Sequence, residues 1–561
     1  MFDRRGFLQI MMAAAALCAP GSLGRAATAQ KISQDDLLRF APLGQITLLH
    51  FADIHAQLMP VYFREPSINI GVGAARALPP HLTGGKLLEY YGIQKGSPEA
   101  YALSSEDFVA LGRNYGRVGG LDRMATLIKA IRAERPGKTI LLDGGDTWQG
   151  SYTSLKTKGA DMVKAMNALG VEAMTAHWEF TYGAERVKEL IGELKFPFLA
   201  GNVRDTSWDE PVFEAVKIFE RAGLRIAVIG QAYPYTPIAN PRYLIPDWSF
   251  GIREDQIRER VNAVREAGVD LVVLLSHNSF DIDRKLASRV AGIDVIFTAH
   301  SHDALPRAMP VGNTLLVASG SHGKFLSRLD LDVRGRRVAG YRYKLIPVFS
   351  DVIDPDPAMA ALIKEVRAPY EAEVNRVLGR TETLLYRRGN FNGTFDDLIC
   401  QALLEERDAQ IALSPGFRWG AALLPGQDIR VEDVFNQTAI TYPNAYRSEF
   451  TGVFLKEVLE AVADNLFHPD PYYQQGGDMV RTGNLAYTID VSKGIGSRIS
   501  DMTLVSTGEK IDANKNYIVS GWASVNEGAQ GPPVYDVVGR YIERHKSVRI
   551  QQNRQVKVLG A

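Results

Sequence analysis

The chain has 561 residues, of which 46% are hydrophobic and 9% aromatic, a composition typical of a globular protein with a large buried core. Lys and Arg number 64, and so do Asp and Glu, so no net charge would attract nucleic acid or an anionic membrane surface, and we expect neither as a partner. The 51 Gly and 27 Pro are spread among apolar runs, which argues against a disordered chain. Only two cysteines, Cys18 and Cys400, are present, which excludes a disulfide scaffold and a cysteine-based zinc site.

Residues 1–29 resemble an export signal. Arg4-Arg5 precedes the apolar run 10–19, and Ala27-Thr28-Ala29 has the small-residue pattern that a signal peptidase accepts. An amphipathic helix or a short anchor is the alternative, but an apolar run of about 10 residues is much shorter than the roughly 20 that span a bilayer. We therefore expect export to the periplasm by the twin-arginine route.

From Gln45 onward, short apolar strands alternate with amphipathic helical stretches, which predicts an α/β fold. The predicted strands are 46–51, 139–142, 173–175, 198–200, 226–229, 271–275, 295–297 and 314–318. The predicted helices between them include 121–135, 159–169, 184–194 and 253–266. Because ligands bind outside the carboxyl ends of the strands in open α/β sheets, the residues that follow these strands are the candidates for a functional site.

Several predicted strands run directly into Asp, His or Asn. These residues are Asp53 with His55, Asp143 with Asp146, His177, Asn202, His277, and His300 with His302. Any single histidine of this kind is readily explained as a hydrogen-bonded loop residue. The set as a whole favours convergence, because strand ends that are distant in sequence meet at one edge of a sheet.

Two tripeptides and a glycine-containing turn indicate how the ligand side chains could be directed toward one place. In an extended segment, Asp53-Ile54-His55 would place two ligand-type side chains on the same side, and His300-Ser301-His302 repeats the arrangement. The glycines of Asp143-Gly144-Gly145-Asp146 let the backbone turn sharply and bring a carboxylate inward.

Mixed imidazole and carboxylate ligands without thiolate favour manganese, zinc or iron(II). The ligands are too many for one ion but suit two ions about 3.5 to 4 Å apart that share a carboxylate. We assign Asp146 as the bridge, and we expect manganese, with zinc as the alternative. The remaining ligands are Asp53, His55 and His302 for one ion, and His177, His277 and His300 for the other.

The chain divides at a charged helical stretch. We predict a metal-binding domain over 30–350, an interdomain helix within 351–379 and a second domain over 380–561, which begins with an amphipathic helix containing Cys400 and Leu403. The alternative is that the charged helix caps the first domain. Strands are predicted at 484–491, 517–519 and 555–559 in the second domain.

A long insertion, 56–118, follows the first motif. Its length and its Gly, Pro and Tyr content predict a functional loop, which we expect to wall the cleft with Arg113, Asn114 and Tyr115 near the site. An ordinary surface loop is the alternative.

Five motifs together resemble those of the calcineurin-like metallophosphoesterases, and the layout is similar to that of the two-domain periplasmic 5′-nucleotidases. The motifs are Leu49-His50-Phe51-Ala52-Asp53-Ile54-His55, Gly119-Gly120-Leu121, Asp143-Gly144-Gly145-Asp146, Ser276-His277-Asn278 and Ala299-His300-Ser301-His302. The resemblance covers nearly all of the chain after the signal. It implies a four-layer α/β/β/α domain with a dinuclear site, followed by a smaller α/β domain that recognises the substrate.

One motif departs from the nucleotidases in an informative way. Where they have Gly-Asn-His-Glu-Phe-Asp, this chain has Ala176-His177-Trp178-Glu179-Phe180-Thr181. The resemblance therefore implies that His177 replaces a metal-binding Asn and that Trp178 replaces the catalytic His. General acid catalysis contributes about 10²- to 10⁴-fold, and an indole cannot supply it. A thiolate leaving group tolerates the loss, because even an ordinary cysteine thiol has a pKa of about 8.5.

The altered block, the export signal and Gln475-Gly476-Gly477-Asp478-Met479-Val480-Arg481 are similar to the SoxB family of thiosulfohydrolases. That resemblance implies a substrate in which a sulfonate group is carried on a cysteine of the SoxYZ carrier protein, and hydrolysis that releases sulfate. Asp146, His177 and Trp178 would be the catalytic residues. We expect the enzyme to be a monomer.

The second domain should supply the rest of the pocket. Ser414-Pro415-Gly416-Phe417-Arg418-Trp419-Gly420 occupies the place of the nucleotidases' Gly-rich block with its substrate-binding Arg. Arg418 and Arg481 are expected to contact the sulfonate, since guanidinium groups suit oxyanions, although each could instead form a salt bridge. Asn202 and Tyr442 complete the predicted substrate-binding set.

Two other functions compete with this interpretation. A periplasmic 5′-nucleotidase or cyclic phosphodiesterase would use the same metal site on a phosphate ester. A binding protein stabilised by metal would dock a partner without turnover.

Overall fold

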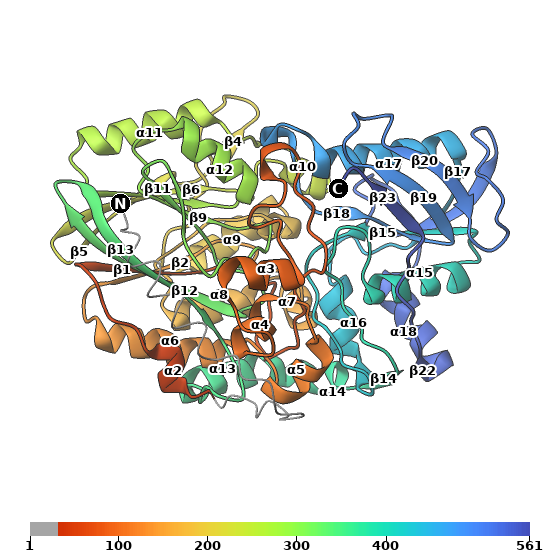
Figure 1. The fold of residues 1–561 in the computed structure, drawn as a ribbon, viewed down its shortest axis with the longest axis horizontal. Helices are drawn as coiled ribbons and strands as arrows, with labels where there is room; N and C mark the ends of the chain where they lie inside the picture. Colours follow the sequence, from red (N-terminus) through yellow and green to blue (C-terminus); the bar gives the residue numbers. More distant parts are fainter. Residues whose placement is uncertain (1–31) are drawn as a thin grey trace, which may run out of the picture. The chain divides into compact units, whose positions relative to one another are not determined.

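The computed structural model describes residues 32–561, so the predicted export signal lies outside the described residues. Two β-sheets contain most of the strands in the first part of the chain (Figure 1). The five-stranded sheet has the order β13-β12-β1-β2-β3, with β1 parallel to β2 and antiparallel to β12. Its strands are β1 (Ile46–Phe51), β2 (Thr139–Asp143), β3 (Ala173–Met174), β12 (Phe325–Arg334) and β13 (Arg337–Pro347).

The second sheet has six strands in the order β10-β11-β9-β8-β6-β5, and its central pairs, from β11 to β6, are parallel. The strands are β5 (Val216–Arg221), β6 (Leu224–Gln231), β8 (Leu271–Ser276), β9 (Val295–Thr298), β10 (Met309–Val311) and β11 (Thr314–Ala318). Every residue of β8 is buried, as expected for a parallel strand covered on both faces.

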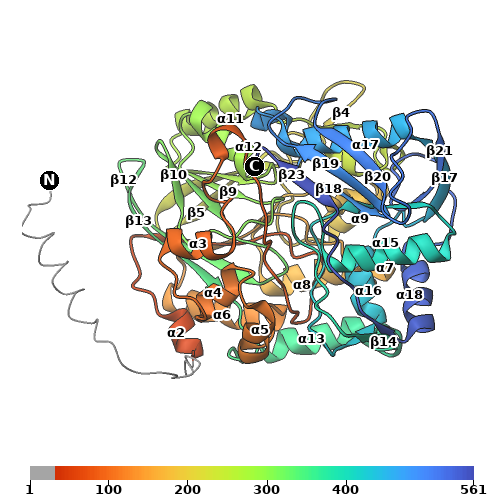
Figure 2. The same ribbon diagram turned by 45° about the vertical axis from the view of Figure 1, so that its right-hand side comes forward.

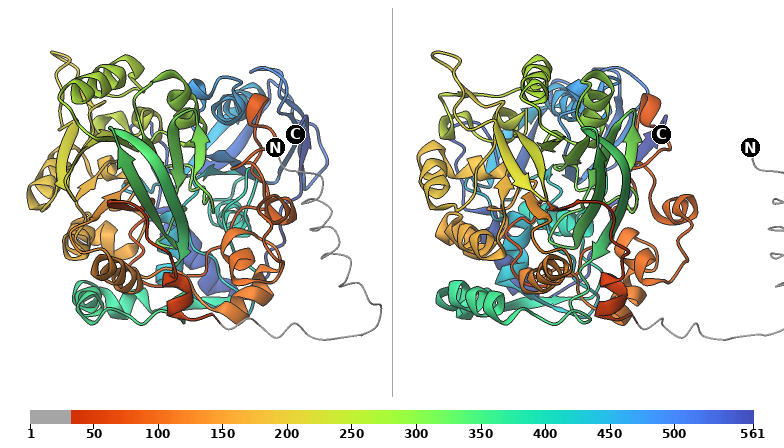
Figure 3. Two further views of the ribbon diagram at one scale, coloured as in Figure 1. Left: turned by 60° about the vertical axis from the view of Figure 1, so that its left-hand side comes forward. Right: turned by 90° about the vertical axis from the view of Figure 1, so that its left-hand side faces the viewer.

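The two sheets pack face to face, with helices on their outer faces (Figure 3). Leu48 and Leu142 of the first sheet share one core cluster with Val273 and Val295 of the second. The outer face of the first sheet packs against α6 (Leu121–Glu134), α8 (Ala160–Leu169) and α9 (Ala184–Glu193). The outer face of the second packs against α11 (Glu254–Glu266) and α12 (Phe280–Arg289). The predicted four-layer α/β/β/α architecture is therefore confirmed.

The C-terminal part, teal to blue in Figure 1, is a smaller α/β arrangement with three further sheets, ordered β16-β14-β22, β17-β21-β15-β18 and β20-β19-β23. Its strands are β14 (Val377–Thr381), β15 (Ile411–Gly416), β16 (Asp428–Arg430), β17 (Tyr446–Thr451), β18 (Asp478–Gly483), β19 (Leu485–Asp490), β20 (Ile499–Leu504), β21 (Asn516–Gly521), β22 (Ser547–Val548) and β23 (Val556–Leu559). Its helices are α15 (Thr394–Glu406), α16 (Val431–Thr438), α17 (Gly452–Phe467) and α18 (Val534–His545). None of the helices within residues 32–561 has both the length and the apolar character of a membrane span.

The predicted interdomain helix is shorter than expected and is interrupted. It consists of α13 (Pro357–Arg367), a 3₁₀ turn over Ala368–Tyr370 and α14 (Glu371–Val374). Pro369 lies in the turn, where it cannot supply the N–H that a continuous helix needs. Met359 and Ile363 pack into the same core cluster as α6, so α13 covers the first part of the chain. The domain boundary near residue 380 stays a prediction.

The second half of the insertion 56–118 is largely helical, whereas residues 56–83 contain no α-helix (Figure 2). It contains α3 (Gly84–Tyr91), α4 (Pro98–Leu103) and α5 (Phe108–Tyr115), orange in the figure. The predicted placement of Arg113, Asn114 and Tyr115 near the site is wrong. Arg113 and Asn114 are exposed, and Tyr115 packs against Tyr101, because α5 uses its apolar face to join the core.

A few short elements complete the fold. They are α2 (Gln34–Leu38), α7 (Tyr152–Thr157), β4 (Arg204–Asp205), α10 (Thr236–Ala239), β7 (Trp248–Ser249) and the 3₁₀ turns Gly73–Ala75, Trp178–Tyr182, Arg242–Leu244 and Pro471–Tyr473. The predicted strand 198–200 makes only single bridges, from Phe198 to Met174 and from Leu199 to Glu214.

Candidate functional site

Seven ligand-type side chains meet where strands of both sheets end, and they form two groups that share Asp146. Within each group the ligand atoms all lie within 4.8 Å of one another. One group is Asp53, His55, Asp146 and His302, and the other is Asp146, His177, His277 and His300. The structure therefore brings the residues together in the same grouping that the sequence predicts.

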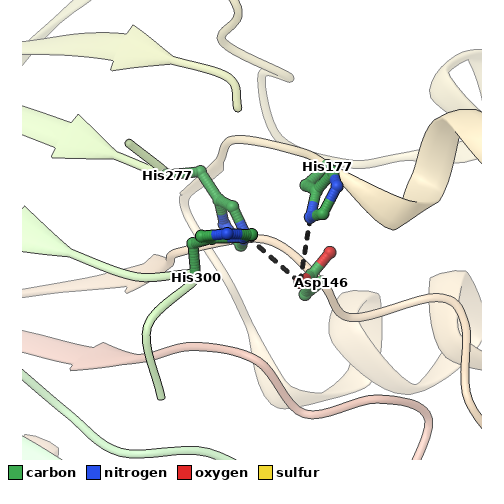
Figure 4. A group of neighbouring side chains, drawn as sticks. All are labelled: Asp146, His177, His277 and His300. Carbon is green, nitrogen blue, oxygen red and sulfur yellow. Dashed lines mark hydrogen bonds and ion pairs between the residues drawn. The ribbon is translucent and has the colours of Figure 1, made fainter. Parts of the chain in front are cut away.

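The group of Asp146, His177, His277 and His300 is centred on one carboxylate oxygen (Figure 4). Asp146 Oδ2 lies 3.3 Å from His177 Nδ1 and 3.2 Å from His277 Nε2. The His300 ring lies 5.5 Å from the His277 ring, measured between centroids. The other oxygen, Asp146 Oδ1, accepts a 2.7 Å hydrogen bond from the Trp178 backbone N–H, which fixes the orientation of the carboxylate.

The ligand atoms of the second group lie equally close to one another. His55 Nε2 lies 3.1 Å from His302 Nε2 and 3.7 Å from Asp146 Oδ2. Asp53 Oδ1 lies 3.4 Å from His302 Nε2. Two imidazole nitrogens facing each other beside two carboxylates form the donor set that a divalent cation would hold together.

The backbone at these residues is left-handed, not extended as the sequence predicts. The φ angles are +53° at Asp53, +48° at His55, +56° at Asp146, +75° at His300 and +58° at His302. Such conformations cost about 1–3 kcal/mol each for residues other than glycine, and they concentrate at functional sites. The turn also sends His300 and His302 into different groups, which side-by-side placement on an extended strand would not achieve.

Neighbouring groups orient the imidazoles. His277 Nδ1 donates a 2.6 Å hydrogen bond to the carbonyl of Gly144, so its Nε2 faces Asp146 without a proton when the ring is neutral. His55 Nδ1 lies 3.4 Å from Gln149 Oε1, which favours the same arrangement. Partners of this kind fix the tautomer of metal-binding histidines.

Glu179 is a functional residue that the sequence analysis missed. Its buried carboxylate accepts backbone hydrogen bonds from Thr147 (2.6 Å), His177 (2.8 Å), Trp148 (3.2 Å) and Asp146 (3.3 Å). It therefore joins the two loops that carry Asp146 and His177. Its position in the Ala176–Thr181 block was visible in the sequence, but its contacts with a distant loop were not.

Protonation in the absence of metal follows from burial and from Asp146. Burial lowers the pKa of His55 to about 4 and also lowers the pKa of His177, His300 and His302, which keeps these imidazoles neutral. Burial alone would lower the pKa of His277 as well, but the carboxylate of Asp146 raises it to about 9.

The donor set fits two divalent cations. His177 Nε2, His300 Nε2 and Asp53 Oδ2 are buried and have no hydrogen-bond partner among residues 32–561. Buried polar atoms rarely remain unpaired, and neutral imidazoles and carboxylates are the ligands that manganese and zinc accept. We therefore regard the two groups as a candidate dinuclear metal centre.

A cavity of about 160 Å³ opens beside the metal ligands. It is lined by Asp146, His177, Trp178, Tyr233, Ile238, Ala239, His300, His302, residues 415–419, Asn465 and residues 475–478. Trp178 is only 5% exposed and meets Phe417 edge-on at 5.3 Å, so the indole forms part of the cavity wall. A larger hollow of about 1230 Å³ lies between residues 56–62, α13 and α16, away from most of the ligands.

Tyr233 also lines this cavity, and the sequence analysis missed it. Its ring stacks on His300 with centroids 4.1 Å apart and lies 4.1 Å from the ring of His177. Its hydroxyl donates to the carbonyl of Gln475. A strand-end search for Asp, His and Asn could not find it, because its role depends on contacts across the fold.

Of the predicted substrate-binding residues, Arg418 lines the cavity. Its guanidinium donates a 2.7 Å hydrogen bond to the carbonyl of Gly477 and lies 3.5 Å from Asp478. It can therefore face an oxyanion while the C-terminal part holds it in place.

The other three predicted substrate-binding residues are not among those that line the cavity. Arg481 is 1% exposed and is held by Asp396 at 3.2 Å and Asp478 at 3.1 Å, which is the salt-bridge alternative. Asn202 uses its side chain to bind backbone groups of Ala232 and Gly251, and the Tyr442 hydroxyl donates to the carbonyl of Ala239. Their polar atoms are therefore engaged in structural contacts.

Residues beyond 380 also support the loop that carries His300 and His302, which we call the metal loop. Arg388 donates to the carbonyls of Ser301 (3.1 Å) and His302 (2.9 Å), and it lies 3.4 Å from Glu65. Glu65, from the insertion, pairs with buried Lys324 at 2.9 Å. The loop that carries His300 and His302 is therefore supported by the insertion and the C-terminal part together.

The model of the family described as 5′-nucleotidase, C-terminal domain, matches residues 377–538. Similar curated proteins include the 5′-nucleotidases of Bos taurus and Homo sapiens. Each is 25% identical, over 433 and 436 residues respectively, which is 70% of this chain and 73% of theirs.

Among solved structures, the sulfate thiohydrolase SoxB of Thermus thermophilus has a TM-score of 0.89 and 36% identity, covering 93% of this chain and 98% of that chain. A 5′-nucleotidase precursor from Thermus thermophilus, with a TM-score of 0.72 and 21% identity, shares the fold over 92% of this chain and 99% of that one. The likeness to SoxB thus extends beyond the fold to the sequence of nearly the whole protein. The chain belongs to the SoxB family, within the superfamily of calcineurin-like metallophosphoesterases and 5′-nucleotidases.

Proposed function

We propose that the chain is a dinuclear metal-dependent thiosulfohydrolase that acts on a cysteine S-thiosulfonate of a carrier protein. The oxygen of water would form a bond to the sulfonate sulfur, and the sulfur–sulfur bond would break. The products would be sulfate and a persulfide on the carrier, with the two protons of water shared between them and the solvent. The single observation that carries this proposal is the indole of Trp178 in the cavity wall.

Trp178 occupies the place that the sequence comparison with the nucleotidases gives to a catalytic imidazole. Its ring centroid lies 4.9 Å from that of His177, close enough for the side chain to border a bound substrate. An indole is a hydrogen-bond donor without a titratable proton, so it cannot protonate an alkoxide leaving group. A sulfur leaving group needs no such proton, because sulfur anions are stable near neutral pH.

The residues of the site have defined tasks in this proposal. When bound, two divalent ions would polarise the sulfonate oxygens and lower the pKa of the attacking water. Asp146 would hold both ions, and the other six ligands of the two groups would complete their coordination. Arg418 would bind the sulfonate, and Trp178 would contact it without transferring a proton.

The metals are proposed to be manganese, with zinc as the alternative, since both accept imidazole and carboxylate ligands. The carrier is proposed to be SoxYZ. A cavity of about 160 Å³ supports a substrate as slender as a modified cysteine side chain. Pockets for drug-sized ligands are larger, about 300–1,000 Å³. The proposed location is the periplasm, and this rests on the twin-arginine pattern of residues 1–29.

Sulfate release tests the proposal. Purified protein should release one sulfate for each thiosulfonate on loaded carrier protein, and removal of divalent metal with a chelator should abolish the release. Added manganese should restore it. Failure to release sulfate from fully loaded carrier, with metal present, would contradict the proposed function.

A 5′-nucleotidase is the second candidate function, and the match of residues 377–538 to the 5′-nucleotidase C-terminal domain favours it. Phosphate release from nucleoside monophosphates at rates comparable with sulfate release would support this candidate. It would also contradict the role given to Trp178.

A further inference from the structure

Trp419 lines the cavity and has a buried hydrogen-bond donor without a partner among residues 32–561. The side chain is 1% exposed and lines the cavity together with Trp178 and Arg418. Its indole Nε1 is buried and has no hydrogen-bond partner among residues 32–561. The established motifs of the metal site do not include this residue, and the proposed function has not so far used it.

An indole N–H that is buried without an acceptor costs free energy, and buried tryptophans usually have a partner for this group. Indole can only donate, so the partner must bring an acceptor atom. The cavity wall contains acceptors, among them Asp146 and Asp478, but no acceptor among residues 32–561 is hydrogen-bonded to Trp419 Nε1. An oxyanion inside the cavity is the acceptor that matches this donor.

The Trp419 ring is held rigidly near the metal ligands. It stacks on Phe417 with centroids 5.2 Å apart and an interplanar angle of 20°. The guanidinium of Arg387 lies 5.1 Å from its ring centroid, and Arg387 is itself fixed by a 2.8 Å ion pair with Asp396. The His55 ring lies 6.3 Å away. A positive charge against the ring strengthens the indole N–H as a donor, because it withdraws electron density.

Two other buried indoles show what is particular to Trp419. Trp522 Nε1 donates a 2.9 Å hydrogen bond to Ser414 Oγ, so its donor is already used. Trp148 Nε1 also lacks a partner among the described residues, but Trp148 is buried in the main core cluster and does not line the cavity. Only Trp419 combines an unpaired buried N–H with a place in the cavity wall, among the residues from 32 to 561.

We propose that the Nε1–H of Trp419 donates a hydrogen bond to an oxygen of the bound sulfonate and, after hydrolysis, of the sulfate product. Trp419 is then a substrate-binding residue that acts together with Arg418, which lines the same cavity. The identity of the oxyanion as a sulfonate rests on the proposed function. The donation itself requires only a tetrahedral oxyanion in the cavity.

Nuclear magnetic resonance of the indole groups tests this directly in the unmodified protein. Tryptophan would be labelled with ¹⁵N, and the protein would be loaded with zinc, which is diamagnetic. Titration with inorganic sulfate should shift the Nε1–H resonance of Trp419 downfield, while the resonance of Trp148 should not move. An unshifted Trp419 resonance at a sulfate concentration that saturates the site would overturn the proposal.

The variant Trp419→Phe removes the N–H and keeps an aromatic ring. We expect its affinity for sulfate, measured by calorimetry, and its kcat/KM for thiosulfonate-loaded carrier to fall at least about tenfold, as is typical when a hydrogen bond to a charged group is lost. The control Trp148→Phe makes the same change at a buried indole outside the cavity, and sulfate affinity should stay within about twofold of the parent. Equal sulfate affinity in Trp419→Phe and the parent protein would contradict the proposal.

The two proposals fail in different ways. If the parent protein releases no sulfate from the carrier but Trp419→Phe still weakens sulfate binding, the donor role is supported and the proposed function is wrong. If the parent releases sulfate and Trp419→Phe matches it in binding and in kcat/KM, the proposed function is supported and the donor role is wrong.

Discussion

Asp146 is the residue on which both metal groups depend, because one of its oxygens faces three histidines while the other accepts a backbone N–H. Asp146→Asn removes the negative charge that both cations would share. We expect metal content to fall from two ions per chain to less than one, measured by mass spectrometry of dialysed protein. His545→Gln, at an exposed position outside both groups, is the control and should keep both ions. Retention of two ions by Asp146→Asn would contradict the bridging role.

Metal binding should release a proton from His277. The pKa of His277 is raised to about 9 by Asp146, so the ring carries a proton at pH 7.5, whereas the other four imidazoles are neutral. Because a cation displaces that proton, metal affinity should increase about tenfold per pH unit up to about pH 9 and then level off. Calorimetry in buffers of different ionisation enthalpy should count at least one proton released, because burial also raises the pKa of the Asp53 carboxyl well above its ordinary value. Metal affinity that does not change between pH 7 and 9 would contradict this.

The side chain at position 178 should determine whether the enzyme can expel an alkoxide leaving group. Trp178→His restores the imidazole that the nucleotidases use, and we expect it to raise hydrolysis of nucleoside monophosphates by about 10²-fold or more, the usual contribution of a general acid. Trp178→Phe should leave phosphatase activity as low as in the parent, since phenyl also lacks a titratable proton. Phosphate release by the three proteins is the measurement, and equal rates in all of them would remove the reason for assigning a sulfur leaving group.

Many individual residues of the site could be predicted from the sequence. The seven ligands follow strands, and the ends of strands converge whatever their distance along the chain. Tyr233 and Glu179 could not be predicted, because their roles consist of contacts with loops that the sequence does not place beside them. Arg481 was assigned to the substrate on residue type alone, and its burial against Asp396, on α15, gives it a structural role instead.

Among the elements, the loop between the 3₁₀ turn Pro471–Tyr473 and β18 lies directly against a metal ligand. A Cβ at Gly476 would lie 2.7 Å from His300 Nε2, and the φ angle there is +76°. Gly477 has a similar φ angle of +77°, but a Cβ there would have no neighbour closer than 3.6 Å.

These two glycines allow a matched test. Both alanine substitutions strain the backbone to a similar extent, but only Gly476→Ala forces His300 to move. We expect Gly476→Ala to reduce sulfate release at least about tenfold through loss of geometry at the metal site, and Gly477→Ala to retain most of it. Equal loss in both variants would show that backbone strain alone, and not His300, is responsible.

Elements with strong apolar patterns were predicted well. The predicted range 46–51 coincides with β1, and α6 and α11 begin or end within a residue of the prediction. The hairpin of β12 and β13 was missed, although its alternating side chains could have revealed it. The helices of the insertion were missed because they are short and are stabilised by packing on the core rather than by their own sequence.

At the scale of the whole molecule, residues 32–561 form one compact unit. The C-terminal part contributes Arg388 to the metal loop, and the Gly420 backbone N–H donates a 2.9 Å hydrogen bond to His322 Nε2, next to the metal ligands. We therefore expect the metal-loaded protein to unfold in a single transition in differential scanning calorimetry, at a temperature that falls when metal is removed. Two separate transitions would show that the predicted domains unfold independently.

We expect this metal centre, with an indole beside it, to act on a sulfur–sulfur bond in preference to a phosphate ester. The most direct test is a competition in one reaction, with manganese-loaded protein, thiosulfonate-loaded carrier and AMP at equal concentrations. Sulfate and phosphate would be separated by ion chromatography over time. We predict that sulfate appears at least about 10²-fold faster than phosphate, because only the ester needs the general acid that the site lacks. Phosphate appearing as fast as sulfate, or faster, would contradict the account.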